Sequence, residues 1–346
     1  MVRRDAALTA GGMLVGTLLA AKAIRSRRAI RFEGRVVMIT GGSRGLGLLL
    51  ARELGRLGAR VVLVARDEPE LERAQQDLRT HEIDATILTG DVTHREQAQQ
   101  LVDGVVKEHA RLDILINNAG IITVGPNDDM THADFEDAMA THFWGPLHMM
   151  QAAIPHMRQA GGGRIANVSS IGGKIGVPHL VPYCASKFAL TGLSNSMRAE
   201  LAPDGIAITT ISPGLMRTGS PFNAWFKGQH RREFAWFAIS DSLPLLSIDG
   251  RRAAVQIVDA IRYGDPELVI TWPARLAVAA GALLPNATAR AIGLVARALP
   301  KPGGRGGRQG RSGWQSASAW APSLLTRASE RAAADNNEIP PGHSRI

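Results

Sequence analysis

The chain has 346 residues, and 40 Lys and Arg against 31 Asp and Glu give a formal net charge of +9. Hydrophobic residues make up 45% and charged residues 21%, as in ordinary globular proteins, which excludes a wholly disordered chain and a protein with many membrane spans. The single cysteine, Cys184, excludes an internal disulfide and a cysteine-based zinc site.

Positive charge is concentrated at the two ends of the chain. Residues 1–31 carry a net charge of +6 and residues 301–346 carry +4, which leaves −1 for residues 32–300. An isoelectric point near 10.5 is typical of nucleic-acid-binding proteins. Because the body is neutral and only the ends are basic, we predict no nucleic-acid partner.

The N-terminal segment, residues 1–31, contains an apolar run over 6–24 that is interrupted only by Lys22. As a helix this run would span roughly 28 Å, enough for one membrane anchor. A heavier arginine cluster follows the run, so the following domain is expected on the cytoplasmic side. Two other interpretations stay open: a cleaved secretion signal, and an interfacial or disordered segment.

Seven short β-branched runs follow, and helical patterns separate them. The runs are residues 35–40, 60–65, 85–90, 112–120, 163–170, 206–212 and 267–271. Buried strands alternating with amphipathic helices predict an α/β domain with a doubly wound parallel sheet over residues 32–272. In such a sheet ligands bind at the carboxyl ends of the strands.

Two segments lie beyond this domain. Residues 273–300 predict two short apolar helices that contact a membrane or cover a pocket. Residues 301–346 are rich in Gly, Arg, Ser and Pro and lack an apolar period, which predicts a disordered basic tail.

A glycine-rich turn, residues 40–47, follows the first predicted strand and precedes a helix. Gly41, Gly45 and Gly47 permit a tight turn and close backbone approach to a pyrophosphate, which the free N–H groups of the helix would bind. The second strand ends at Ala65-Arg66 without the acidic residue that favours NAD. Arg66, together with Arg44, favours NADP because guanidinium groups bind the 2′-phosphate.

A second group of residues carries acid–base chemistry. Ser170 is followed by Tyr183 and then by Lys187, one helical turn after the tyrosine. A phenol has a pKa near 10, and we expect the neighbouring ammonium to lower it. Ser170 would then hold the substrate oxygen while Tyr183 transfers the proton. Its neighbour Ser169 would point to the other face of the strand.

With these motifs the chain resembles the short-chain dehydrogenase/reductase family, in its shorter single-domain branch with a Rossmann fold, over about residues 34–271. The resemblance implies an NADP-dependent oxidoreductase that acts on a carbonyl or secondary alcohol, with Ser170, Tyr183 and Lys187 as catalytic residues. It also implies cofactor contacts from the glycine turn, from Tyr183 and Lys187, and from residues after four other strands. The expected cofactor residues are Gly41, Ser43, Arg44, Gly45, Leu46, Gly47, Arg66, Asp91, Val92, Asn118, Ala119, Gly120, Tyr183, Lys187, Pro213, Gly214 and Thr218.

One position departs from the family pattern. Many members carry an asparagine that completes a proton relay, at the first position of Asn-x-x-Gly, and here the residue is His142. Three interpretations stay open: His142 preserves the relay, it only packs there, or the enzyme is weakened. Cys184 is expected to be a packing residue, and no metal-ligand grouping of histidines is present in the sequence.

Residues 214–249 are the expected substrate lid, and the segment from Phe222 to Phe237 holds six aromatic residues. They predict an apolar or lipid-like substrate, a surface that dips into a bilayer, or simple packing of the lid. The alternative to an enzyme is a non-catalytic NADP-binding sensor. The resemblance further implies a homo-oligomer that pairs through helices near 131–157 and 181–202.

Overall fold

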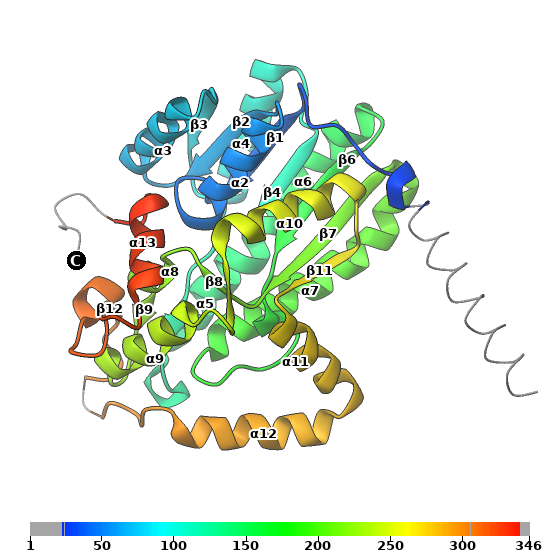
Figure 1. Ribbon diagram of the computed structural model, residues 1–346. Helices are drawn as coiled ribbons and strands as arrows, with labels where there is room; N and C mark the ends of the chain where they lie inside the picture. The colour runs from blue at the N-terminus through cyan, green and yellow to red at the C-terminus, as the bar shows by residue number, and fades with distance from the viewer. Residues whose placement is uncertain (1–22, 24, 305, 340–346) are drawn as a thin grey trace, which may run out of the picture.

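The computed structural model describes residues 23, 25–304 and 306–339. Its centre is a seven-stranded sheet in the order β3-β2-β1-β4-β6-β7-β11, with every neighbouring pair parallel (Figure 1). The strands are β1 (Val36–Thr40), β2 (Arg60–Ala65), β3 (Ala85–Thr89), β4 (Ile114–Asn117), β6 (Gly163–Val168), β7 (Ile206–Pro213) and β11 (Glu267–Ile270). This confirms the predicted doubly wound α/β fold.

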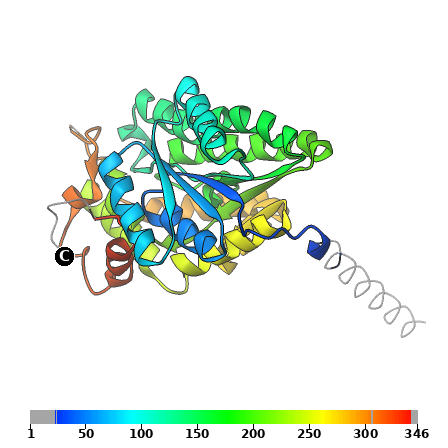
Figure 2. The same ribbon diagram turned by 90° about the horizontal axis from the view of Figure 1, so that it is seen from above.

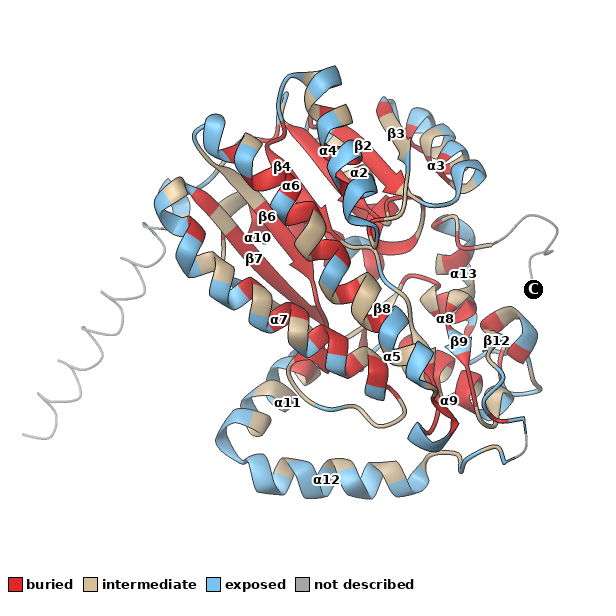
Figure 3. Ribbon diagram, turned by 180° about the vertical axis from the view of Figure 1, so that it is seen from behind, coloured by how far each residue is buried: buried red, intermediate tan, exposed pale blue. Residues whose placement is uncertain are grey.

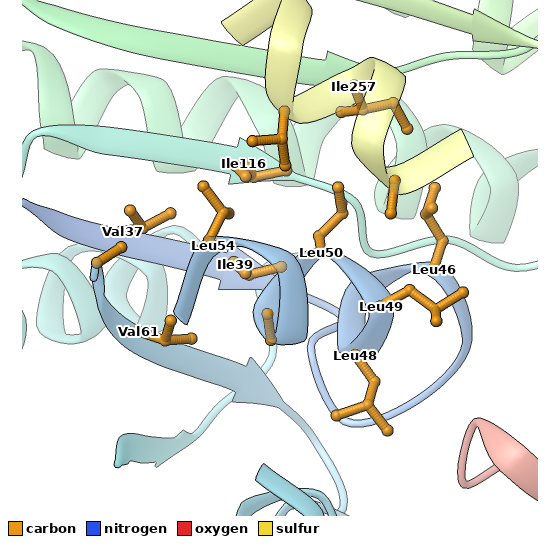
Figure 4. Packing of buried hydrophobic residues seen from close by; sticks show 14 of the residues in the cluster. Val37, Ile39, Leu46, Leu48, Leu49, Leu50, Leu54, Val61, Ile116 and Ile257 are labelled. Carbon is orange, nitrogen blue, oxygen red and sulfur yellow. The ribbon is translucent and has the colours of Figure 1, made fainter. Parts of the chain in front are cut away.

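Helices cover both faces of the sheet (Figure 2). One face is covered by α2 (Gly45–Arg56), α3 (Glu68–Thr80) and α10 (Gly250–Tyr263), and the other by α4 (Arg95–His109), α6 (Gly145–Gln159) and α7 (Val181–Leu201). Side chains alternate along each strand, so Val37 and Ile39 pack under α2 and α10 (Figure 4), whereas Val36 and Met38 join the opposite core.

The order of the strands reverses between β1 and β4, which lie side by side although β2 and β3 intervene in the chain. In parallel sheets such a reversal leaves a crevice at the carboxyl ends of the strands, where ligands bind. The glycine turn follows β1 at this edge, and Asn118 follows β4. The remaining short segments of the body are β5 (Thr123–Val124), η1 (Asn127–Asp129), η3 (Ile171–Gly173) and η4 (Ala202–Asp204).

The helix expected near 131–157 is divided into three parts. They are α5 (His132–Met139), a π-helical turn η2 (Ala140–Trp144) and α6. A π-helical turn inserts an extra residue into the helix and often occurs at functional sites. The inserted turn contains His142, the position that departs from the family pattern.

The expected lid forms a small subdomain of β8 (Leu215–Arg217), α8 (Ser220–Asn223), β9 (Trp225–Phe226), α9 (His230–Ser242) and β10 (Ser247–Asp249). Four of its aromatic residues are buried in one apolar cluster: Phe222, Phe226, Phe234 and Phe237. Packing of the lid is therefore the interpretation that fits these four.

The structure confirms two helices after the domain, α11 (Trp272–Leu283) and α12 (Pro285–Ala298). It differs from the expectation of a disordered tail over residues 306–339, which contain β12 (Arg311–Ser312), η5 (Gly313–Ser316) and α13 (Arg327–Asp335). β12 pairs with β9, and Ala321 and Ala333 are buried in the lid cluster. The tail has too few apolar residues for a core of its own, but it is ordered because the lid supplies one.

The predicted N-terminal anchor, residues 6–24, lies outside the described residues except for Ala23. Among the residues that the structure describes, no helix is both long and apolar enough to span a membrane. The same residues contain no group of His, Cys, Asp and Glu side chains that would hold a metal ion.

Candidate active site

The glycine turn lies between β1 and the first residues of α2. Gly41 and Gly45 have positive φ angles of 62° and 55°, which only glycine adopts without strain. A Cβ at Gly47 would collide with the carbonyl oxygen of Gly41. These three glycines are therefore required by the backbone, and the turn directs the first N–H groups of α2 toward the place where a dinucleotide phosphate is expected.

Asn118, which follows β4, holds the turn in place. Its side-chain amide donates to the carbonyl oxygens of Thr40 and Gly41, at 3.2 and 3.0 Å. In return the Thr40 hydroxyl accepts hydrogen bonds from the backbone N–H groups of Asn118 and Ala119. The predicted segment Asn118–Gly120 thus lies against the glycine turn.

The predicted adenosine end of the site contains two arginines and two carboxylates. Arg66 follows β2, its side chain is 68% exposed, and it lies 3.7 Å from Asp91. Arg44 is paired with Glu70 at 2.9 Å. Burial would raise the pKa of Asp91, but two hydrogen bonds from Thr93 and the charge of Arg66 hold it below its usual value. Asp91 is therefore ionised at neutral pH.

The structure brings Ser170, Tyr183 and Lys187 together as predicted. Ser170 follows β6, its hydroxyl accepts the N–H of Gly172 at 3.0 Å, and it lies near enough to the Tyr183 hydroxyl to act on the pKa of the tyrosine. Lys187 lies one turn beyond Tyr183 on α7, and its ammonium donates to the Val168 carbonyl at 2.8 Å and lies 5.6 Å from the centre of the tyrosine ring.

Burial determines the protonation of this group. It raises the pKa of Tyr183 to about 12, against the opposing hydrogen bond from Ser170, and lowers the pKa of Lys187 to about 7. The expected lowering of the tyrosine pKa by Lys187 is not found, because desolvation of the phenolate dominates. Tyr183 is therefore protonated at neutral pH, as a proton donor must be.

The two neighbouring residues have the roles expected of them. Ser169 points away from Tyr183, and its hydroxyl bonds to the Lys187 carbonyl at 3.1 Å and the Thr191 hydroxyl at 2.9 Å. Cys184 is buried, and burial raises the pKa of its thiol. A protonated thiol is a weak nucleophile, so packing is the role that fits Cys184.

His142 lies beside Tyr183 with its ring edge-on to that of the tyrosine, at 5.3 Å between centres. Its Nε2 accepts the backbone N–H of Ile121 at 3.1 Å, and its Nδ1 lies 2.8 Å from the Ser186 hydroxyl. Ser186 in turn donates to the Tyr183 carbonyl. This pattern places the ring proton on Nδ1, and burial holds the pKa of His142 well below its usual value.

The predicted nicotinamide end of the site follows β7. Pro213 ends this strand, and Gly214 lies so close to Thr271 that a Cβ there would be 2.6 Å from the threonine hydroxyl. Thr218 is 3% exposed. The buried Ser212 hydroxyl on β7 has no hydrogen-bond partner among the described residues.

Sequence reasoning missed three residues at the glycine turn. Glu70 binds Arg44 and the Ser43 hydroxyl, Asn223 of the lid contacts Arg44 at 3.3 Å, and Glu338 of the tail lies 3.8 Å from Arg44. Glu70 and Asn223 could not have been predicted from the sequence, since they are polar residues outside any motif. For Glu338 the sequence offered one indication: Ser329 and Ala333 are one helical turn apart and form the buried face of α13, the helix that precedes Glu338.

The chain's residues fit a dinucleotide. The glycine turn forms a close-fitting cradle, because side chains at Gly41 and Gly47 would collide with neighbouring backbone atoms. Arg44 and Arg66 lie where the adenosine phosphate of NADP is expected. Together with the strand order, this cradle defines a protein with the Rossmann fold of dinucleotide-binding domains. A family model described as short chain dehydrogenase matches residues 35–224, more than half of the chain. The protein belongs to the short-chain dehydrogenase/reductase family.

Curated relatives support this assignment. A "Dehydrogenase/reductase SDR family protein 7-like" of Anopheles gambiae is 38% identical over 207 residues, which are 57% of this chain and 64% of the relative. A gluconate 5-dehydrogenase of Gluconobacter oxydans is 34% identical over 54% of this chain and 73% of its own. The chain thus matches less than two thirds of the first of these relatives.

Solved structures show the same fold. A short-chain dehydrogenase from Streptomyces avermitilis is 26% identical and superposes with a TM-score of 0.66 over 77% of this chain and 98% of its own. A gluconate 5-dehydrogenase from Burkholderia cenocepacia, solved with NADP and tartrate, is 26% identical and reaches 0.63 over 71% of this chain and 97% of its own.

Proposed function

We propose that the protein is an NADPH-preferring oxidoreductase that transfers a hydride between the nicotinamide and a carbonyl or secondary alcohol, with Tyr183 as the acid and base. The observation that carries this proposal is the grouping of Ser170 and Tyr183 with the buried Lys187, whose Nζ lies 5.6 Å from the centre of the tyrosine ring. These residues lie at the same edge of the sheet as the glycine turn, since both follow parallel strands.

When bound, the cofactor supplies or accepts the hydride. Ser170 holds the substrate oxygen, and Tyr183, with a pKa of about 12, keeps its proton until negative charge develops on that oxygen. Lys187 faces the tyrosine ring from the buried side, where an ammonium stabilises a phenolate as it forms. His142 fixes the backbone of the tyrosine's turn through Ser186 and remains neutral.

Three observations support NADP over NAD. No carboxylate ends β2, Arg66 is mostly exposed there, and Arg44 stands at the start of α2. In addition, the structural relative from Burkholderia was solved with NADP, as was a metagenomic short-chain oxidoreductase that is 29% identical with a TM-score of 0.57. An exposed guanidinium is available to bind a phosphate bidentately.

We further propose an apolar substrate. Partly buried Ile122, Val177 and Trp236 pack against the same apolar cluster as Tyr183, which makes the surroundings of the tyrosine largely apolar. The four buried lid phenylalanines give no support, because they pack against the tail.

The test is an NADPH-oxidation screen with the full chain across carbonyl classes, with Tyr183→Phe as the blank. We expect turnover of long-chain or steroid-like ketones that falls by a factor of at least about 100 in Tyr183→Phe. Equal rates in both proteins would contradict the proposed catalysis. Good activity on small polar ketones alone would contradict the apolar substrate and leave the catalysis standing.

An apolar substrate also fits a membrane location, and α11 and α12 offer a contact surface. Figure 3 shows α12 exposed along most of its length. The exposed apolar residues of the pair are Trp272, Leu276, Leu283, Leu284, Leu294 and Val295. Arg275, Arg290 and Arg297 lie among them, and no acidic residue occurs between Glu267 and Glu330. We infer that this surface binds an anionic membrane from the cytoplasmic side.

Sedimentation with vesicles measures this contact. We expect the full chain to bind vesicles rich in phosphatidylserine, and Leu294→Glu with Val295→Glu to weaken the binding by a factor of roughly ten. The matched control is Leu245→Glu, an exposed leucine that is 78% accessible in the lid. Unchanged binding by the double variant would exclude α12 as the contact.

A further inference from the structure

The C-terminal segment Asp335–Glu338 lies across the glycine turn. The carbonyl oxygen of Asn336 accepts the backbone N–H of Gly45 at 2.9 Å. The Asn337 side chain donates to the Ser43 carbonyl at 2.8 Å, and the Asn336 side chain donates to the Thr218 carbonyl at 3.2 Å. The segment therefore contacts both the glycine turn and the lid.

Glu338 completes this contact with a buried carboxyl group that is 4% exposed. The group accepts a hydrogen bond from the Asn223 amide and lies 3.8 Å from the Arg44 guanidinium. One carboxyl oxygen is so close to the Cα of Gly45 that no Cβ fits between them. An acidic side chain thus lies at the N-terminus of α2, where the positive end of the helix dipole favours an anion.

These contacts use groups that the proposed function assigns to the cofactor. The N–H of Gly45 is one of the free donors expected to bind the pyrophosphate, and Arg44 is expected to bind the 2′-phosphate. An N–H that donates to Asn336 is not free to donate to a phosphate, and the Glu338 carboxyl occupies space beside Gly45 that the phosphate would need. The segment and the cofactor therefore exclude each other.

The segment is presented by an anchored helix. Ser329 of α13 bonds to Ser242 of α9 at 2.7 Å in a buried contact, and Ala333 packs so tightly on Gly219 that a Cβ there would be 2.5 Å away. Arg52 of α2 donates to the Asp335 carbonyl at 2.7 Å. Because α13 is fixed beside the turn, the segment has a high effective concentration at the site.

We propose that Asp335–Glu338 is a second, intramolecular ligand of the dinucleotide site and that it competes with NADPH for the glycine turn. The inference rests on the proposed function, since it needs the cofactor to bind at this turn. Binding of NADPH then requires the segment to leave, and the measured affinity is reduced by the fraction of molecules in which the site is covered.

The test compares direct NADPH binding by the full chain, by a chain that lacks residues 336–346, and by Glu338→Ala. The truncation keeps α13, and Glu330→Ala is the matched control because that carboxylate bonds to Thr326 within the tail. We expect the truncation to lower the dissociation constant by a factor of roughly ten and Glu338→Ala to lower it by less. Glu330→Ala should bind NADPH like the full chain.

A second readout does not involve the cofactor. Amide hydrogen exchange of residues 43–48 should be slower in the full chain than in the truncated chain, and a synthetic peptide of residues 335–346 should weaken NADPH binding by the truncated chain. Equal dissociation constants in the full and truncated chains would overturn the competition. If no variant bound NADPH or NADH, the proposed function would fail and the competition with it, whereas slower exchange would still show the contact.

Discussion

The proposed preference for NADP depends mainly on Arg66, whose side chain is mostly exposed to solvent. It follows a strand whose register with β1 and β3 is fixed, so its position is set by the sheet. Its partner Asp91 is 3.7 Å away, and exposed pairs of this kind contribute about 0–1 kcal/mol. Arg66 is therefore free to turn toward a phosphate at little cost.

Replacing Arg66 by aspartate should reverse the preference. A carboxylate repels the 2′-phosphate and accepts hydrogen bonds from a ribose, so we expect the ratio of kcat/KM for NADPH to that for NADH to fall by a factor of at least about 10. Steady-state kinetics with both cofactors measure this ratio. Arg60→Asp, at the exposed opposite end of β2, is the matched control. An unchanged ratio in Arg66→Asp would refute the assigned role.

His142 illustrates how a position can depart from a family pattern and keep a defined place. Both ring nitrogens are used in hydrogen bonds, and desolvation opposes a charge on the ring. Since its pKa lies well below the usual value, His142 is neutral at neutral pH. We regard it as a positioning residue for the turn that carries Tyr183.

Substitution of His142 by asparagine tests this role. The shorter side chain cannot reach both Ile121 and Ser186, so we expect a loss of stability of about 1–3 kcal/mol and a lower kcat with little change in KM. The pH profile of kcat/KM should keep its shape between pH 6 and pH 9. The loss of a limb from that profile would show that His142 itself titrates, and a much higher kcat would support a weakened natural enzyme.

At the scale of elements, α13 and the segment after it join the lid to the glycine turn through two buried carboxyl groups. Burial raises the pKa of Asp241 and of Glu338 to about 7 each. Arg44, Asn223 and Glu70 face Glu338, and Arg217 and Ser329 face Asp241. The arginines and hydrogen bonds act to lower these pKa values, and burial outweighs them.

These raised values give the docked tail a pH dependence. A carboxyl whose pKa is higher when docked binds more protons in that state, so docking is strongest below about pH 4.5 and weakens as pH rises through about 7. We expect protection of amides 43–48, corrected for intrinsic exchange, to fall between pH 6 and pH 8. Glu338→Gln, which resembles the protonated acid, should retain more of that protection at pH 8. Protection that rose with pH would contradict this assignment.

On the scale of the whole molecule, the exposed faces indicate how copies associate. Trp144 and Phe188 are 48% and 45% exposed, on neighbouring η2 and α7, the region expected to pair in an oligomer. We predict that the chain is a dimer or larger and that Phe188→Glu shifts it toward the monomer, as measured by light scattering. Leu283→Glu, an equally drastic change on α11, should leave the mass unchanged. A monomeric full chain would contradict the prediction.

The strands, the glycine turn and the Ser, Tyr and Lys set could be predicted because each depends on local pattern: a run of Val and Ile, a φ angle only glycine adopts, one helical turn between two residues. The ordered structure of the tail could not be predicted, because Ala321 and Ala333 are buried in a cluster with Phe222 and Phe234, about 100 residues earlier in the chain. The π-helical turn at Ala140–Trp144 was not predicted either, since its sequence continues the pattern of an ordinary helix. The structure of the tail depends on packing between residues far apart in the chain, which its composition does not reveal.

Because Gly45 and Asn336 are far apart in the chain, the glycine turn is synthesised long before the segment that covers it. The two residues are hydrogen-bonded although their positions in the chain differ by 291. At translation rates of about 5–20 residues per second, roughly 15–60 s pass between the synthesis of the turn and that of the segment that covers it. Under the proposed competition, a new molecule whose sheet has folded presents an uncovered turn until the segment is made, and the nucleotide concentration during synthesis decides which ligand occupies the turn first.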